Sequence, residues 1–205
     1  MVKFSSLYRL VRILGAGGYG IVAEVVCLQT ERRLALKITS YSPNHISSGA
    51  RSLLNECKLL TEELSHPNII KVFKRSLEQN YSNYIIMEME LGLETLRSYA
   101  ARVHLSEEQA SAAMRGIFSA LEYLHNTNNV IHRDIKPENI VIMDYEDLSS
   151  VKLIDFGLAV HANGVQQVSD FAKCGTLLYV PPEQISKNFA YAKKADMWAA
   201  GIITH

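Results

Sequence analysis

The sequence lacks the features of a secreted, membrane-spanning or nucleic-acid-binding protein. Its 205 residues include three cysteines, whose odd number and scattered positions argue against a disulfide framework or a zinc site. The formal net charge is +0, so no overall field attracts nucleic acid or an acidic membrane surface. The N-terminus has no apolar signal core, and no apolar run is long enough to span a bilayer. We therefore expect a soluble protein of the reducing cytoplasm, with no nucleic-acid partner.

Internal repeats, low-complexity tracts and calcium-binding loops of the D-x-[DN]-x-[DN]-G type are also absent. With 48% hydrophobic residues, the chain can nevertheless bury a sizeable core. Apolar runs and alternation predict five strands, at 8–14, 21–28, 34–38, 69–73 and 84–89. A helix is predicted over 48–64, and its apolar stripe comprises Leu53, Leu54, Cys57, Leu60 and Leu64.

Three glycines between the first two predicted strands indicate a phosphate-binding turn. Gly15, Gly17 and Gly20 let backbone amides approach a triphosphate closely. The same G-x-G-x-x-G spacing occurs in dinucleotide-binding folds, where a helix begins directly after the third glycine. Here residues 21–26 have a strand pattern instead, and Val22 follows at the spacing needed to cover a purine. The pattern therefore favours a glycine-rich loop between strands over a Rossmann turn.

A lysine on the third strand has an acidic candidate partner in the first helix. Ala35 and Lys37 share one face of the strand because side chains alternate, and this is the face expected to hold the purine. Glu56 lies beside the apolar stripe of the predicted helix. A solvated lysine on an edge strand is the alternative interpretation. Glu62 and Glu63 are the competing acids, and both are expected on the exposed side of the helix.

Residues 132–139, with the sequence HRDIKPEN, bring a carboxylate, an ammonium and an amide together. Asp134 can accept a proton from an attacking hydroxyl, and Lys136 can neutralise charge on a moving phosphoryl group. Asn139 can bind a metal through its amide oxygen. A polar surface loop is the alternative for these residues alone. The combination indicates phosphoryl transfer.

The second half of the chain predicts helices and one hairpin. A capping box at 106–109 opens a helix that ends near residue 126. Its expected buried face comprises Ala110, Met114, Ile117, Leu121 and Leu124. Short strands at 140–142 and 151–154 predict a hairpin, which places Asn139 beside Asp155. Two oxygen ligands of one magnesium ion require such a placement.

Taken together, these motifs resemble the catalytic domain of the eukaryotic-type protein kinases. The matching segments are G-x-G-x-x-G-x-V at 15–22, Lys37, the HRDIKPEN segment at 132–139 and Asp-Phe-Gly at 155–157. The resemblance runs from the first strand to the last residue. Lys136, two residues after the candidate catalytic aspartate, matches the serine/threonine branch. The residues of the motifs are most similar to those of the calcium/calmodulin-dependent kinases.

The resemblance implies an α+β fold with two lobes and ATP in the cleft. About residues 1–90 would form an N-lobe of five strands and one helix, and about residues 91–205 a mostly helical C-lobe. Because the chain stops at His205, we expect an incomplete C-lobe. The implied activity is transfer of the γ-phosphoryl group of Mg-ATP to serine or threonine hydroxyls of proteins. A catalytically weak nucleotide-binding or interaction module is the alternative, on account of the missing C-lobe helices.

The resemblance also assigns expected roles to individual residues. The expected catalytic residues are Asp134, Lys136, Lys37, Glu56 and Thr176. The expected ATP-binding residues are Leu14, Gly15, Gly17, Gly20, Val22, Ala35, Lys37, Met87, Glu88, Glu90, Glu94 and Val141. Met87 would guard the back of the pocket, the backbone of 88–90 would bond the adenine edge, and Val141 would lie under the purine. Asn139 and Asp155 are the expected Mg²⁺ ligands.

Substrate choice and regulation give two further expectations. Glu94 falls where basophilic members of the family carry an acid, so Glu94, together with Glu138, would bind an arginine three residues before the acceptor serine. Contact with the ribose of ATP and a solvated surface position are the alternatives for Glu94. The segment 155–183 has the length of a substrate-binding lid. Its usual phosphorylated threonine is replaced by Ala172, so we expect a lid that works without phosphorylation unless Ser169 substitutes.

Overall fold

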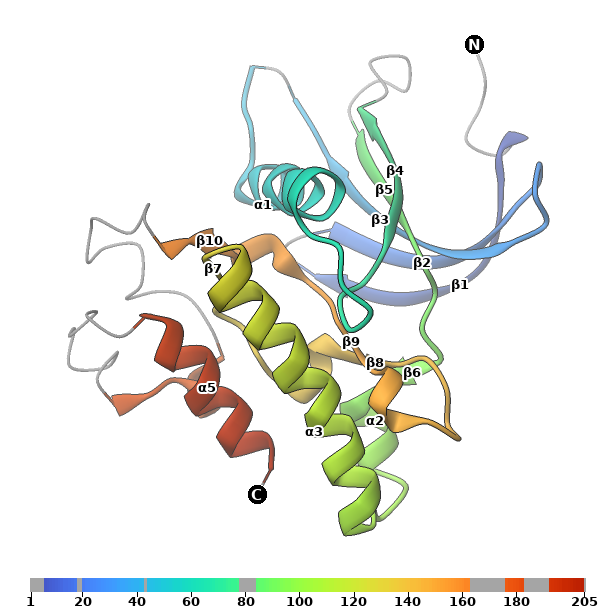
Figure 1. Cartoon of the computed structure of the whole chain (residues 1–205). Coiled ribbons are helices and arrows are strands. Elements are labelled where there is room, and N and C mark those ends of the chain that lie inside the picture. Colours follow the sequence, from blue (N-terminus) through green and yellow to red (C-terminus); the bar gives the residue numbers. More distant parts are fainter. Residues whose placement is uncertain are drawn as a thin grey trace. The chain divides into compact units, whose positions relative to one another are not determined.

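A five-stranded antiparallel sheet forms the first part of the computed structural model (Figure 1). The structure describes residues 6–17, 20–42, 44–77, 84–162, 176–182 and 192–204. These residues belong to two compact units, one of residues 1–63 and 71–91 and the other of residues 64–70 and 92–205. Each unit is described by itself below.

The sheet of the first unit has the order β1-β2-β3-β5-β4. Its strands are β1 (Tyr8–Gly17), β2 (Gly20–Cys27), β3 (Arg33–Ser40), β4 (Val72–Leu77) and β5 (Tyr84–Met89). All neighbouring strands run antiparallel. The expectation of a five-stranded sheet is therefore confirmed.

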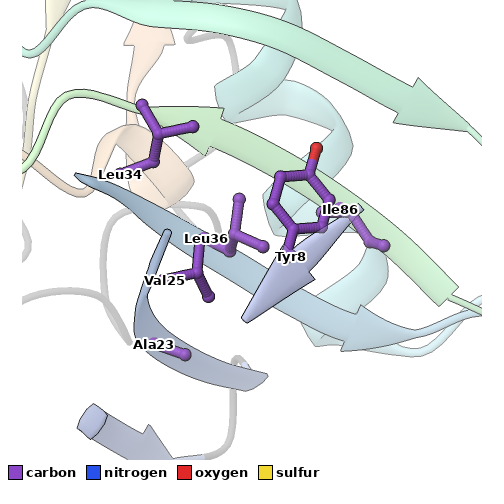
Figure 2. Close-up of a cluster of buried hydrophobic side chains, with 6 residues drawn as sticks. All are labelled: Tyr8, Ala23, Val25, Leu34, Leu36 and Ile86. Carbon is purple, nitrogen blue, oxygen red and sulfur yellow. The ribbon is translucent and has the colours of Figure 1, made fainter. Parts of the chain in front are cut away.

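Alternation in the central strands builds the core of this sheet (Figure 2). Every second residue of β2 and β3 points to one face, where Ala23, Val25, Leu34 and Leu36 cluster with Tyr8 and Ile86. Leu36 is fully buried, and burying such a side chain contributes about 1.5–3 kcal/mol. The hydroxyl of Tyr8 is satisfied because it donates a hydrogen bond to the buried carboxylate of Glu88.

One helix packs on the sheet against β3 and β5. Helix α1 spans Ser48–Lys58 and continues as a π-helical turn over Leu59–Glu63. Its first turn is capped by Ser47, whose hydroxyl accepts a hydrogen bond from the N–H of Ala50. The predicted stripe is buried at Leu53, Cys57, Leu60 and Leu64, whereas Leu54 is half-buried.

The second unit contains helices and short strands. Its helices are α2 (Leu96–Ala100), α3 (Glu107–Glu122) and α5 (Ala192–Ile203), with a π-helical turn at Tyr123–Thr127. The strands β6 (Glu94–Thr95), β8 (Ile140–Ile142) and β9 (Lys152–Leu153) form one sheet, and β7 (Val130–Ile131) pairs with β10 (Val160–His161). Within the described ranges, no helix is long and apolar enough to cross a membrane.

The capping box expected at the start of α3 is present. The hydroxyl of Ser106 accepts from the N–H of Gln109, and the side chain of Gln109 accepts from the N–H of Ser106. The predicted face of this helix is buried at Met114, Ile117, Leu121 and Leu124, and half-buried at Ala110. Helix α3 packs against the segment between β8 and β9, which holds the hairpin in place.

The strand predicted at 69–73 begins later than expected. β4 starts at Val72, and Ile69 instead forms a parallel bridge with Leu153 of the second unit. The buried amide of Asn68 fixes this path, because its Nδ2 donates to the carbonyls of Ser149 (2.7 Å) and Val151 (2.8 Å). An apolar run shows that its residues are buried, but it does not show against which sheet they pack.

Gly20 is required by packing rather than by an open turn. Its φ is +119°, and a Cβ at this position would lie 2.2 Å from the carbonyl oxygen of Ile38.

We predict that Gly20→Ala lowers the free energy of unfolding by roughly 2–4 kcal/mol, through backbone strain and overpacking. A Cβ at Gly15 would meet nothing within 4 Å. Gly15→Ala, as the matched control, should change stability by less than about 0.5 kcal/mol in urea unfolding. Equal stability of the two variants would contradict the packing role of Gly20.

Candidate active site

The first unit places Lys37 and Glu56 together. Lys37 Nζ lies 2.6 Å from Glu56 Oε2, and both side chains are buried. Buried charges of this kind persist only when paired, since an unpaired one is strongly disfavoured. Lys37 is in register with Val22 on β2 and with Met87 on β5. Three residues expected at the nucleotide therefore form one cross-strand row.

The glycine-rich turn lies at the exposed end of this row. Leu14, Gly15 and Gly17 are all exposed, and no atom lies within 4 Å of a Cβ built at either glycine. Gly15 pairs with Val22 across the β1–β2 hairpin. The backbone of this turn is therefore open to an approaching phosphate, as the spacing predicts.

The expected hinge residues have partners within the first unit. The carboxylate of Glu88 accepts from Tyr8, and that of Glu90 accepts from the N–H of Lys71 at 2.6 Å. The N–H of Glu90 donates to the carbonyl of Lys71 at 3.0 Å. An adenine could take the Glu90 N–H only by displacing that carbonyl. Met87 is fully buried behind these residues, and Ala35 is also buried in β3.

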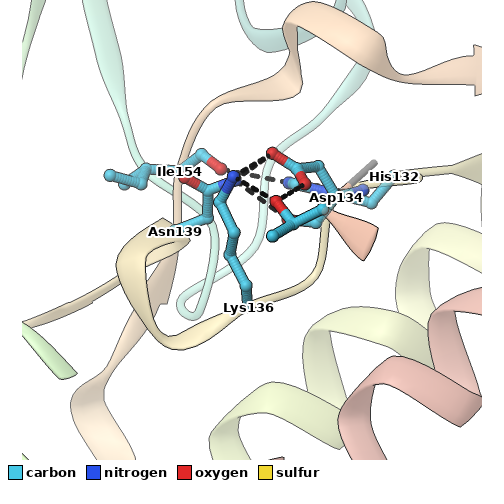
Figure 3. A network of polar contacts seen from close by, with 6 residues as sticks. His132, Asp134, Lys136, Asn139 and Ile154 are labelled. Carbon is cyan, nitrogen blue, oxygen red and sulfur yellow. Dashed lines mark hydrogen bonds and ion pairs between the residues drawn. The ribbon is translucent and has the colours of Figure 1, made fainter. Parts of the chain in front are cut away.

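In the second unit, three polar side chains converge on the carboxylate of Asp134 (Figure 3). Lys136 Nζ lies 2.6 Å from Asp134 Oδ2, and Asn139 Nδ2 donates to the same oxygen at 2.9 Å. Thr176 Oγ1 donates to Asp134 Oδ1 at 3.0 Å and accepts from Lys136 Nζ at 2.9 Å. These contacts bring Asp134, Lys136, Asn139 and Thr176 into one network and fix the orientation of the Asp134 carboxylate.

Asp196 of helix α5 holds the segment that carries this network. Its two oxygens accept from the backbone N–H groups of His132 (2.9 Å) and Arg133 (2.8 Å). His125 Nε2 lies 2.8 Å from the same carboxylate, and Asp196 is 1% exposed. Sequence analysis gave neither His125 nor Asp196 a role. The available indication of a role for Asp196 was its place just before Ala199 and Ala200, which are buried. An acid is rarely buried without strong donors.

The expected metal ligands are linked through the main chain. The N–H of Ile154 donates to the carbonyl of Asn139 at 3.0 Å, which brings Asp155 next to it in the hairpin. Asp155 has a left-handed backbone, with φ +63°. Asn139 Nδ2 is used by Asp134, so its amide oxygen is the atom that remains for a cation.

This donor set fits magnesium better than a metal held by protein alone. Within the described ranges, no group of three or more His, Cys, Asp and Glu residues could hold a metal ion. Magnesium at phosphoryl-transfer sites is bound by one or two protein ligands together with substrate phosphates and water. The oxygens of Asn139 and Asp155 would supply such a partial set.

Two residues expected to bind ATP, Val141 and Glu94, lie in the second unit. Val141 is half-buried in β8, and a Cβ on Gly92 would lie 2.7 Å from it. Glu94 is paired with Arg102 and with the hydroxyl of Tyr145. The hydrogen bond from Arg102 holds the pKa of Glu94 below its ordinary value.

Residues 163–175 and Glu183 of the predicted lid lie outside the described residues, and these include Ser169 and Ala172. Of the residues next to it, Arg133 has φ +70° and donates from Nε to the carbonyl of Leu158 at 2.6 Å. A pocket beside Asp134 is lined by Thr176, Tyr179, Pro181 and Ala199. The expectation of a lid that works without phosphorylation stays a prediction.

Comparison with known proteins gives one consistent result. Residues 8–205 match the family model described as protein kinase domain. The serine/threonine-protein kinase DCLK1 of Rattus norvegicus is 35% identical over 199 residues, covering 97% of this chain and 44% of that protein. The calcium/calmodulin-dependent protein kinase type II subunit delta of Oryctolagus cuniculus is 32% identical over 203 residues, covering 99% and 37%. The chain thus spans less than half the length of these relatives.

Because both carboxylate oxygens of Asp196 accept backbone hydrogen bonds, we predict that stability is sensitive to the loss of either oxygen. Asp196→Asn keeps one acceptor oxygen, so the N–H of His132 or Arg133 would face an NH₂ group. We expect the free energy of unfolding to fall by about 2–4 kcal/mol, measured by urea unfolding. Asp144→Asn, which alters an exposed turn bond to Glu146, should change it by less than about 0.5 kcal/mol. A stable Asp196→Asn variant would contradict the assigned role.

Proposed function

The chain belongs to the protein kinase domain family, and from this premise we propose that it transfers the γ-phosphoryl group of ATP to serine and threonine hydroxyls of protein substrates. The observation that carries the proposal is the network of Asp134, Lys136, Asn139 and Thr176. Asp134, Lys136 and Asn139 present a carboxylate, a cation and an amide oxygen within one partly buried segment. Phosphoryl transfer needs these groups and little else from the protein, because positioning and charge stabilisation supply most of the catalysis.

Asp134 would act on the acceptor hydroxyl. Thr176 and Asn139 fix the two carboxylate oxygens from different sides, so the carboxylate is held ready to accept the hydroxyl proton. Lys136 lies 2.6 Å from that carboxylate and is the cation available to the charge that develops on the transferred group. The names of the relatives and the position of Lys136 both support serine or threonine as the acceptor.

Lys37 would orient the nucleotide phosphates, and Glu56 would hold Lys37 in place. Bound Mg-ATP would supply the phosphoryl group and the charge neutralisation, with Asn139 and Asp155 as the protein ligands of magnesium. The open backbone at Gly15 and Gly17 offers amide donors to the phosphates.

The first test is Lys37→Met, which removes the ammonium and keeps the aliphatic stem. We expect phosphorylation of a generic serine peptide to fall by about 10²- to 10³-fold, the usual effect of losing one charge-stabilising group. The control is Lys58→Met, since Lys58 is exposed and its Nζ lies 3.8 Å from Glu63. That control should keep the parental rate.

Loss of stability must be separated from loss of chemistry in this test. Lys37→Met leaves Glu56 without its buried cation, which destabilises the unit. The double variant Lys37→Met/Glu56→Gln removes both charges and should regain stability without regaining activity. Parental phosphorylation rates in Lys37→Met would overturn the role of Lys37.

The second test concerns Asp155. Asp155→Asn should weaken ATP binding in the presence of magnesium by roughly tenfold or more, about 1.4 kcal/mol, because a neutral amide binds the cation less strongly. ATP binding in the presence of a chelator should change by less than about twofold. Isothermal titration at both conditions gives the comparison, with Asp147→Asn as an exposed-turn control. Equal effects with and without magnesium would show that Asp155 does not act through the metal.

A further inference from the structure

Glu94 lies at the centre of a cluster built by three segments of the second unit. The guanidinium of Arg102, which follows α2, donates to Glu94 Oε1. The hydroxyl of Tyr145, from the turn after β8, donates to the same oxygen at 2.7 Å. The Glu94 side chain is 18% exposed and that of Arg102 is 55% exposed. Glu94 therefore already has a cationic and a neutral donor from its own chain.

Two aromatic rings hold Arg102 in this position. Its guanidinium carbon lies 5.1 Å from the ring centre of Tyr99 and 6.0 Å from that of Tyr145. The two rings stack on each other with centroids 5.6 Å apart. Cation–π contacts of this kind attract a guanidinium to the ring face even at exposed sites. Arg102 is thus pre-organised against Glu94 rather than sampling solvent freely.

We propose that Arg102 occupies Glu94 in place of a substrate cation and so masks an acidic substrate-binding subsite. A substrate cation at the position facing Glu94 would accordingly give a peptide no advantage over a neutral residue there. This inference rests on the proposed kinase function and adds a specificity-determining pair, Arg102 and Glu94. It reverses the simple expectation that an acid at position 94 selects basic substrates.

Competition within one chain favours the masked state. A substrate arginine must bind from solution, whereas Arg102 is tethered eight residues from Glu94 and has a high effective concentration there. Both donors contact Oε1, so an arginine binding side-on through two bonds must displace one of them. The lowered pKa of Glu94 keeps this carboxylate ionised in the paired state.

The other acid expected to bind arginine provides an internal comparison. Glu138 Oε1 lies 3.8 Å from Arg97 Nε, and the two side chains are 47% and 68% exposed. No ring contact holds Arg97 among the contacts found in the described residues. An exposed pair at this distance is weak, so Arg97 masks Glu138 far less than Arg102 masks Glu94.

The experiment measures specificity as a ratio, which cancels differences in folded fraction between variants. Peptides carry one arginine at each of the five positions before an acceptor serine, and the reference peptide carries alanine there. For the unsubstituted chain, the ratio of kcat/KM for each arginine peptide to that of the reference should be close to one. In Arg102→Ala this ratio should rise about fivefold to tenfold at one position. This is the increase expected from one partly exposed charge-assisted hydrogen bond.

Four further variants test the mechanism. Arg102→Lys keeps a cation and should retain the parental ratio, and Arg97→Ala is the matched control, with less than about a twofold change. Arg102→Ala/Glu94→Gln should return the ratio to the parental value. An unchanged ratio in Arg102→Ala at every position overturns the masking proposal, as does a parental arginine preference that Glu94→Gln abolishes.

Failure of the proposed function is recognised separately. If neither the parent nor any variant phosphorylates a peptide, the kinase proposal fails. Masking is then decided by fluorescence anisotropy of labelled arginine and alanine peptides. If Arg102→Ala raises the affinity for the arginine peptide but not for the alanine peptide, masking is supported without catalysis. Equal affinity of Arg102→Ala for both peptides would refute it.

Discussion

The buried carboxylate of Asp196 is the contact on which the catalytic segment depends. Arg133 has a left-handed backbone, with φ +70°, so the N–H groups of His132 and Arg133 cannot join a regular strand. Buried N–H groups need partners, and each oxygen of Asp196 accepts one of them. The charge on Asp196 is in turn tolerated only because these donors and His125 surround it. The backbone path into Asp134 therefore depends on a residue in a helix more than sixty positions later in the sequence.

The same principle applies to charges elsewhere in the chain. Glu24, fully buried in β2, accepts from Arg12 and Arg33 at 2.8 and 2.7 Å, and the hydrogen bond from Arg12 is the main cause of its lowered pKa. Lys37 of β3 and Glu56 of α1 form a second buried pair. Such pairs add little net stability, since desolvation offsets most of the attraction. Their effect is to fix positions, which in the case of Lys37 is what orientation of a phosphate would require.

Local sequence predicted much of this arrangement. Period-two and helical patterns gave the five-stranded sheet, helix α1 and the α3 capping box, and the spacing of short motifs gave the polar segment at 132–139. The start of β4 was wrong because apolar runs do not identify the sheet they join. Partners distant in sequence, such as Asp196 for His125 and Tyr145 for Glu94, were not predicted. No local pattern specifies which of many donors a carboxylate meets after folding, so these contacts required the structure.

Glu94 shows why this distinction matters for function. A linear motif predicts an acid at a given place, but the acid acts on a substrate only if its charge is available. Arg102, Tyr99 and Tyr145 give Glu94 a satisfied state without substrate and at the same time join β6, α2 and the turn after β8. The fold thereby avoids an unpaired, largely buried carboxylate, which would be costly. Specificity is a difference between competing affinities, and here the first competitor is part of the same chain. A requirement of folding therefore becomes a determinant of which substrates gain from a positive charge.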